Sequence, residues 1–255
     1  MGFFFLRFST VSFWLVGSVL AACSPRVQVR YAGQNSPTTA AVDARVAPDS
    51  SIAALIAPYK SQVDAKMNRV IGQAASELTK VGIESALGNF IADLSRQQAT
   101  KHFGRPVDMG MTASGGLRVP IAAGDVTVGD IFELMPFENE LWVLTLDGAM
   151  TEQLFRHLAK VKNLSISNAQ VTLQNGELQG VLIHGKPLQK DTLYTLATTD
   201  YLASGGDGLD FLKAAKAIKP LNVKFRDAII DHIENLTRQG KLVDARVEGR
   251  VQVRE

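Results

Sequence analysis

The chain has 255 residues, of which 46% are hydrophobic and 20% are charged, and its formal net charge is +2. This length is enough for one sizeable globular domain or for two small domains that share a core. The near-neutral charge argues against a protein that binds nucleic acid polymers, because such a protein needs a basic stripe on its surface.

The first 22 residues have the pattern of an export signal. Arg7 precedes an apolar run from Val11 to Leu20, which is too short to span a membrane comfortably. Leu20-Ala21-Ala22-Cys23 resembles the lipobox of bacterial lipoproteins, and the resemblance implies cleavage before Cys23 and lipidation of its sulfur. Each buried CH₂ of an acyl chain contributes about 0.8 kcal/mol, so two chains would anchor the protein firmly. The alternatives are a plain secretory signal or a buried spare cysteine.

Cys23 is the only cysteine, so an internal disulfide is impossible. Ser24 rather than Asp follows it, which favours the outer membrane. We therefore expect a lipid-anchored protein of the bacterial cell envelope that faces the periplasm. Residues 23–50 are rich in Ser, Pro, Thr, Ala and Gln without periodicity and predict a flexible tether. One folded domain is expected over residues 51–255.

Two helices are predicted at the start of this domain. Apolar residues at helical spacing predict an amphipathic helix from Ser51 to about Arg69, with most charged side chains on its other face. A second helix is expected from near Glu84 to His102, and Gly104-Arg105-Pro106 ends it.

The first candidate site loop follows a short apolar strand, Val107 to Thr112. The loop reads Ala113-Ser114-Gly115-Gly116-Leu117-Arg118. Paired glycines expose backbone N–H groups, and the guanidinium of Arg118 offers a planar fork for phosphate or carboxylate. The alternative is an arginine that caps a neighbouring helix.

The second candidate is Phe137. A short helix from Ile131 to Leu134 is broken by Pro136-Phe137-Glu138-Asn139, which precedes a strand from Glu140 to Leu146. Because Phe137 lies on an exposed proline turn, a packing role is less expected for it than for a residue in the middle of a strand.

The remaining pattern alternates helices with short strands and tight turns. We predict a helix from Gly148 to about Val161, strands at Gln170–Leu173, Leu178–Ile183 and Tyr194–Thr198, a helix at Asp227–Arg238 and a strand at Val243–Val253.

The third candidate loop, Thr199 to Gly208, follows the strand that ends at Thr198. Tyr201 stands six positions before Asp207, and glycines at 205, 206 and 208 surround that carboxylate. Glycine adopts positive φ without strain and lets other groups approach the backbone. A strand that ends in such a loop presents side chains at the rim of a sheet, where ligands tend to bind. The alternative is a tight surface turn with a capping aspartate.

Four spaced segments together resemble the C-terminal, substrate-binding domain of the 5′-nucleotidases, a family that includes UDP-sugar hydrolases. They are Glu84…Leu87-Gly88-Asn89, Ser114-Gly115-Gly116-Leu117-Arg118, Pro136-Phe137-Glu138-Asn139 and Tyr201…Ser204-Gly205-Gly206-Asp207-Gly208. The resemblance covers about Ser51 to Val253. It implies an α+β fold in which mixed sheets are sandwiched between helices, in four layers.

The resemblance also implies roles for individual residues. Phe137 and Tyr201 would stack on a nucleobase, a contact worth roughly 1–3 kcal/mol per base. Asp207 would accept hydrogen bonds from ribose hydroxyls. The full expected substrate-binding set is Arg118, Phe137, Asn139, Tyr201, Gly205, Gly206 and Asp207, with Asn139 at the base edge and Arg118 towards the phosphate or ribose.

Three departures weaken the expectation of phosphate binding, one of which is a short loop between Val161 and Gln170 that lacks a ligand-contact glycine of the family. Glu77, Lys80 and Val81 stand where some family members carry further phosphate-binding arginines, and Ala113 stands where some carry asparagine. Base and ribose recognition is therefore better supported than phosphate recognition.

The largest departure concerns catalysis. Hydrolysis in this family belongs to an N-terminal two-metal domain with Asp-x-His, Gly-Asn-His-Asp/Glu and His-x-His signatures. None of these signatures occurs here, and the four histidines are scattered singly at positions 102, 157, 184 and 232. We expect no catalytic residue, metal ligand or cofactor in this chain, and divalent metals only in a separate metallophosphoesterase.

Three hypotheses follow. In the first, the chain is the nucleotide- or nucleoside-recognition half of a split 5′-nucleotidase whose partner is a separate metallophosphoesterase chain. In the second, it is a non-catalytic lipoprotein that binds nucleosides or serves as an interaction module. In the third, least favoured, it is a self-sufficient hydrolase with an unrecognised site.

Overall fold

The computed structural model describes residue 43, residues 45–162 and residues 164–254. The chain divides into two units, residues 1–50 and residues 51–255. Cys23, the predicted signal peptide and most of the predicted tether lie outside the described residues. Within the described ranges, no helix is both long enough and apolar enough to cross a membrane.

The predicted first helix is present as α2 (Ser50–Met67). None of its residues is buried. Leu55, Tyr59 and Val63 are 66%, 69% and 54% exposed, so the apolar side chains expected to pack on one face remain at the surface.

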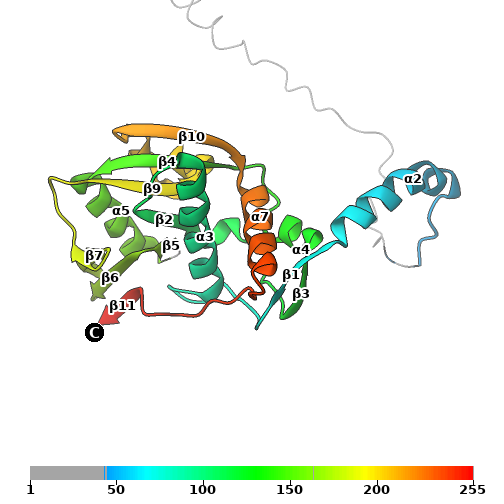
Figure 1. The fold of residues 1–255 in the computed structure, drawn as a ribbon, viewed down its shortest axis with the longest axis horizontal. Coiled ribbons are helices and arrows are strands. Elements are labelled where there is room, and N and C mark those ends of the chain that lie inside the picture. The colour runs from blue at the N-terminus through cyan, green and yellow to red at the C-terminus, as the bar shows by residue number, and fades with distance from the viewer. Residues whose placement is uncertain (1–42, 44, 163, 255) are drawn as a thin grey trace, which may run out of the picture. The chain divides into compact units, whose positions relative to one another are not determined.

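A mixed five-stranded sheet in the order β10-β4-β9-β2-β5 forms the centre of the second unit (Figure 1). The strands are β2 (Met109–Ala113), β4 (Glu140–Asp147), β5 (Leu164–Ser167), β9 (Leu193–Thr199) and β10 (Ala217–Lys224). β9 runs parallel to β2 and antiparallel to β4. The ends of β2 and β9 and the start of β4 therefore meet at one edge of the sheet.

A layer of helices covers one face of this sheet. α3 (Ala86–Phe103) packs against β2, β5 and α7 (Phe225–Arg238), and α4 (Val128–Leu134) packs against α7. A small two-stranded sheet of β1 (Val70–Ala74) and β3 (Gly124–Thr127) adjoins this layer. α3 lies close to β2 because Gly110 has no side chain, and a Cβ there would overlap the carbonyl oxygen of Ala92.

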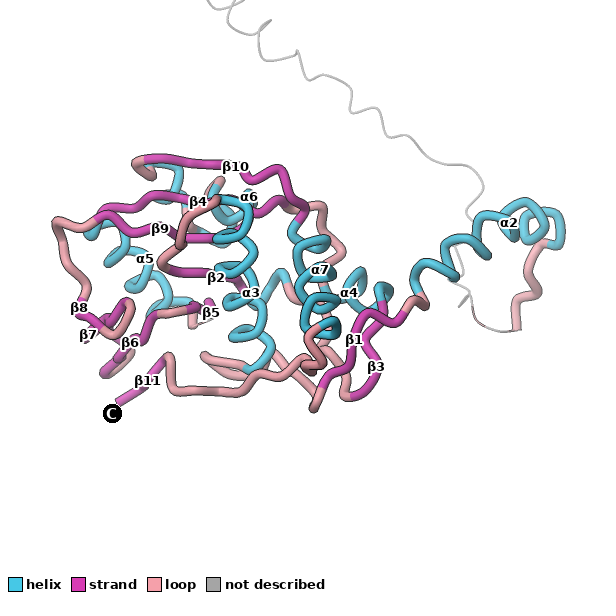
Figure 2. The backbone as a smooth tube through the Cα atoms, in the orientation of Figure 1, coloured by secondary structure: helices cyan, strands magenta, loops and turns pink. Residues whose placement is uncertain are grey.

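On the other face lie α5 (Gly148–Val161) and a four-stranded sheet in the order β11-β6-β7-β8 (Figure 2). Its strands are β6 (Ala169–Gln174), β7 (Glu177–Ile183), β8 (Lys186–Pro187) and β11 (Val251–Arg254). The described residues form two hydrophobic cores, one between the central sheet and the layer of α3 and α7, and one between the sheet and α5. Side chains alternate between the two faces of β4, so Leu141 and Val143 lie in the first core and Leu144 and Leu146 in the second. The layers confirm the expected α+β fold with mixed sheets and helices.

Several elements differ from the sequence prediction: β1, β3, β5 and β8 were not predicted, and α4 begins at Val128 rather than Ile131. α7 begins at Phe225 rather than Asp227. β10 was not predicted, and it tolerates Pro220 because it is an edge strand. The strand expected over Val243–Val253 is wrong for most of its length, because only β11 forms a ladder and Val243 makes an isolated bridge to Ala74.

A buried carboxylate fastens both the segment before β11 and the first residue of β11. The backbone N–H groups of Glu248 and Val251 donate to the carboxylate of Glu84, at 2.7 and 3.1 Å. Figure 1 shows this segment running from α7 along the lower side of the unit to β11.

Candidate functional site

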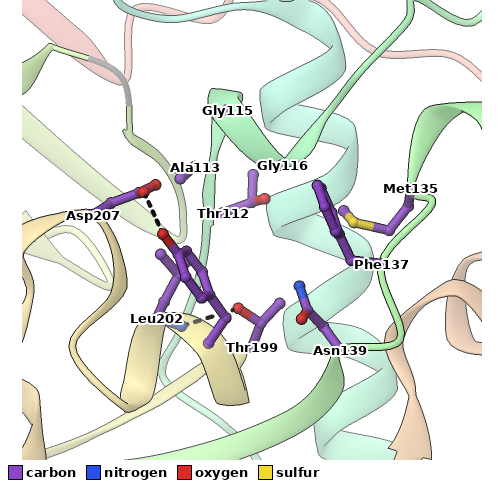
Figure 3. Close-up of a pocket in the computed structure, with 11 residues that line it drawn as sticks. Thr112, Ala113, Gly115, Gly116, Met135, Phe137, Asn139, Thr199, Leu202 and Asp207 are labelled. Atoms are coloured by element: carbon purple, nitrogen blue, oxygen red, sulfur yellow. Dashed lines mark hydrogen bonds between the residues drawn. The ribbon is translucent and has the colours of Figure 1, made fainter. Parts of the chain in front are cut away.

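A cavity of about 240 Å³ opens at the sheet edge where β2, β4 and β9 meet (Figure 3). Eleven residues line it: Thr112, Ala113, Gly115, Gly116, Met135, Phe137, Asn139, Thr199, Tyr201, Leu202 and Asp207. Nine of them come from the three segments that the sequence marked as candidates, 113–118, 136–139 and 199–208. The parallel pairing of β2 with β9 brings the first and third of these segments together.

Two exposed aromatic rings border the cavity. Phe137, on the turn before β4, is 45% exposed, and Tyr201, in the short helix α6 (Asp200–Ala203), is 51% exposed. Among the described residues, Phe137 and Tyr201 do not stack on each other, so a face of each ring remains available. Exposed aromatic faces beside a cavity are available to stack on a planar ligand.

Tyr201 is held from two sides. Its hydroxyl donates to Oδ1 of Asp207 at 3.0 Å. This hydrogen bond, and the charge of the carboxylate, raise the pKa of Tyr201 above its ordinary value. Gly206 lies against the ring, and a Cβ there would overlap ring atoms Cε1 and Cζ. The glycine is therefore required for the observed position of the ring.

Asp207 faces the cavity from a left-handed turn. The φ angles are +94° at Gly205, +54° at Asp207 and +79° at Gly208, in the region that favours glycine and tolerates aspartate. Figure 3 shows Asp207 and Phe137 on opposite sides of the cavity. A Cβ on Gly115 would lie 4.0 Å from Oδ2 of Asp207, in ordinary van der Waals contact, so this loop borders the carboxylate.

Polar groups complete the lining. The carboxamide of Asn139 points towards the cavity (Figure 3), and it makes no hydrogen bond within the described part of the chain. Its donor and acceptor therefore remain available to a ligand. The hydroxyl of Thr199 accepts from the backbone N–H of Leu202 at 3.3 Å and caps α6.

Arg118 lies beside the cavity rather than in its lining. Its Nη1 donates to the carbonyl of Gly115 at 3.3 Å, and the side chain is exposed. Lys80 supports the same loop, since its Nζ donates to the carbonyl of Leu117 at 2.5 Å. Gly205 and Gly206 also lie outside the lining, as the backbone supports of Asp207 and Tyr201.

Two lining residues, Thr112 and Met135, lie outside the segments that the sequence marked as candidates. Each lies within one or two positions of a residue or motif that was singled out. Their signal was therefore position in the chain rather than residue type.

The Glu84 to Asn89 segment has a packing role. Asn89 Nδ2 donates to Glu84 Oε1 at 2.8 Å, in addition to the two backbone donors described above. Burial opposes ionisation of Glu84, but these hydrogen bonds outweigh it and lower the pKa of the carboxyl. Gly88 faces Ser165, whose side chain a Cβ would overlap. This segment secures the start of α3 and does not reach the cavity.

Three of the four histidines make separate contacts. His184 pairs with Asp108 at 2.9 Å, His232 packs edge-on against Phe90, and His157 packs against Phe211. Within the described ranges, no group of three or more His, Cys, Asp or Glu side chains could hold a metal ion.

Comparison with known proteins identifies the family. The family described as 5′-nucleotidase, C-terminal domain, matches residues 63–214. Protein UshA of Yersinia enterocolitica is 30% identical over 176 residues, which cover 64% of this chain and 30% of that protein. Cell wall protein Lmo0130 of Listeria monocytogenes is 28% identical over 232 residues, which cover 80% of this chain and 29% of that protein.

A solved structure supports the same assignment. The crystal structure of a 5′-nucleotidase precursor from Thermus thermophilus superposes with a TM-score of 0.69 at 26% identity, covering 81% of this chain and 44% of that one. The chain thus spans less than half the length of these relatives. It belongs to the 5′-nucleotidase C-terminal domain family.

Proposed function

We propose that the cavity binds a nucleoside or nucleotide, with Phe137 and Tyr201 stacking on the base. The observation that carries this proposal is the meeting of two exposed rings and one carboxylate at a single cavity, from loops far apart in the sequence. Base–aromatic stacking is worth roughly 1–3 kcal/mol per base and tolerates different bases. The relatives named 5′-nucleotidase and nucleotide phosphoesterase are consistent with such a ligand.

Asp207 suits the ribose. An ionised carboxylate only accepts hydrogen bonds, and a ribose presents two hydroxyl donors. Oδ1 already accepts from Tyr201 at 3.0 Å, and Oδ2 carries no hydrogen bond within the described part of the chain. Each carboxylate oxygen has two lone pairs, so the diol can bind without displacing the tyrosine. Asn139 then meets the base edge with its free carboxamide.

The charge of the cavity lining determines how well the site can bind the phosphate of a nucleotide. Among the described residues, Asp207 is the one charged residue in the lining, so the lining carries no cation to attract a phosphate. Arg118 would have to leave the carbonyl of Gly115 and turn towards the ligand. We assign it that role, because a guanidinium–phosphate contact is charge-assisted and is worth about 1.5–3 kcal/mol.

We further propose that the chain acts as the recognition half of a split 5′-nucleotidase. A separate metallophosphoesterase would supply the divalent metals and the attacking hydroxide. The family match to a C-terminal domain supports this arrangement. The lipid anchor at Cys23 would place both chains at the outer membrane, facing the periplasm.

The alternative is a non-catalytic lipoprotein that captures nucleosides. The anionic lining favours it, because a neutral nucleoside needs no cation. The two proposals share the ligand site and differ in the partner.

Calorimetric titration of the full chain in mild detergent tests the site. Adenosine should bind, and Tyr201→Ala and Asp207→Ala should each weaken binding about tenfold or more, because one removes a stacking face and the other the ribose acceptor. Tyr59→Ala, on the exposed surface of α2, and Asp191→Ala, in an exposed turn, serve as matched controls. Equal effects of site and control variants would refute the site.

The ratio of AMP to adenosine affinity reports on Arg118. Tighter binding of AMP, lost in Arg118→Ala, supports phosphate contact and the split enzyme. Tighter binding of adenosine supports capture. Metal-dependent AMP hydrolysis by the pure chain, abolished by Asp207→Ala, would contradict both proposals and revive a self-sufficient hydrolase.

A further inference from the structure

Arg226 is a buried cation close to the cavity. Within the described ranges, it makes no hydrogen bond to the side chain of a lining residue. It lies in the first turn of α7, and its side chain is only 9% exposed. Its Cζ lies 3.9 Å from the centroid of the Phe132 ring, which is cation–π geometry. A charge is buried in a protein only where partners compensate its lost hydration. The partners of Arg226 therefore show what it holds in place.

Those partners flank Phe137 on both sides. Nη1 donates to the carbonyl of Met135 at 3.3 Å, and Nη2 donates to the carboxylate of Glu138. Met135 precedes the proline turn and Glu138 follows Phe137 directly. One guanidinium thus spans the turn that carries the aromatic ring.

The neighbours of Arg226 hold the same turn. The backbone N–H of Phe225 donates to the carbonyl of Asn139 at 2.8 Å. Lys224 Nζ donates to the carbonyl of Glu138 at 3.2 Å. The start of α7 therefore fixes the segment from Met135 to Asn139 along its length, while the Phe137 ring itself stays 45% exposed.

We propose that Arg226 is a positioning residue for ligand recognition, which holds Phe137 ready to stack on a base. This inference rests on the proposed function of the cavity. Arginine suits the role because its planar fork reaches two acceptors while its face covers Phe132, which the single point charge of lysine cannot do. A turn fixed before binding loses less conformational entropy when the ligand binds.

The test compares Arg226→Lys with Glu138→Gln, which changes a 67% exposed partner and is therefore tolerated by the fold. Arg226→Lys should weaken adenosine binding by the full chain about tenfold, and Glu138→Gln by a smaller factor. The same changes on a Phe137→Ala background should have no further effect, because the ring through which they act is gone. Equal losses with and without Phe137 would overturn the inference.

Arg250→Lys is the matched control. Arg250 is also buried, at 12% side-chain exposure, and it pairs with Asp93 at 2.7 Å and Glu248 at 2.8 Å, away from the cavity. Its replacement should lower thermal stability without changing adenosine affinity. A loss of affinity as large as that of Arg226→Lys would show that Arg226 has only a structural role.

Hydrogen exchange separates this inference from the proposed function. Arg226→Lys should raise amide exchange in the segment 135–139, and Arg250→Lys should not. If the unaltered chain bound no adenosine, the proposed function would fail, and the recognition role of Arg226 with it. If adenosine bound but exchange in 135–139 were unchanged by Arg226→Lys, the inference alone would fail.

Discussion

The residues at the cavity are defined by backbone geometry as much as by side-chain chemistry. Asp207 stands at a φ of +54°, between two glycines that are also left-handed, Gly205 and Gly208. Glycine at 206 has ordinary φ but lies under the Tyr201 ring. The turn therefore fixes an acceptor and an aromatic face together, and the Tyr201–Asp207 hydrogen bond joins them.

Gly206→Ala tests this arrangement by adding a single methyl group. The added methyl would overlap the Tyr201 ring and push it from its place. Adenosine affinity should fall about tenfold, since stacking supplies roughly 1–3 kcal/mol, while thermal stability should change little because the ring is half exposed. Gly180→Ala is the control, because open space surrounds that position. Unchanged affinity in Gly206→Ala would contradict the role of the ring.

Among the elements, the start of β4 and the start of α6 are joined by a single carboxylate. Asp200 Oδ1 accepts from the backbone N–H of Tyr201 at 2.8 Å and from that of Glu140 at 3.1 Å. Glu140 follows Asn139, so this oxygen links the segments that carry the two aromatic rings.

Asp200→Ala should therefore affect both stability and binding. It leaves the Glu140 N–H without its acceptor, which costs about 1–3 kcal/mol in the free energy of unfolding, measured by urea titration. Adenosine affinity should fall as well. Asp200→Asn keeps an acceptor oxygen and should lose less of both. Equal losses in the two variants would show that the hydrogen bonds are not the cause.

Across the whole molecule, Glu84 ties the beginning of the folded unit to its end. The carboxylate is 7% exposed and joins the start of α3 to the segment before β11. The pKa of Glu84 is lower in the folded chain than in the unfolded chain, where it is about 4.3. The ionised carboxylate therefore stabilises the fold at pH values above about 4.3, and this stability is lost as the pH falls through the folded pKa.

Glu84→Gln should destabilise the protein by about 1–3 kcal/mol at pH 7, because the amide NH₂ would face N–H donors. The difference from the unaltered chain should shrink as the pH falls from about 4.3 through the lower folded pKa, because the carboxylate is protonated first in the unfolded chain and then in the folded one. Urea unfolding at several pH values measures it, with the exposed Glu77→Gln as control. A difference that is constant with pH would disprove the assignment.

Much of this architecture could be predicted from local pattern. Helical spacing predicted α2, α3 and α5, and glycine-rich loops after strands marked the segments that meet at the cavity. Long-range effects could not be predicted. The alternation from Val243 to Val253 suggested one strand, but only Val251–Arg254 forms a ladder, and the amide of Glu248 donates to the Glu84 carboxylate. The edge strand β10 was not predicted, because a proline such as Pro220 argues against a strand. No local pattern shows that Arg118 donates to the carbonyl of Gly115 in its own loop.

The cavity is lined from the ends of β2 and β9 and from the turn before β4, so it forms only when these strands are paired. A ligand that binds there binds the native chain and not the unfolded one. Mass action then adds to global stability, by about 2.7 kcal/mol at a ligand concentration of 100 times Kd. The melting temperature of the whole unit thus becomes a readout of occupancy, and a panel of nucleosides ranked by thermal shift gives the base preference of the site directly.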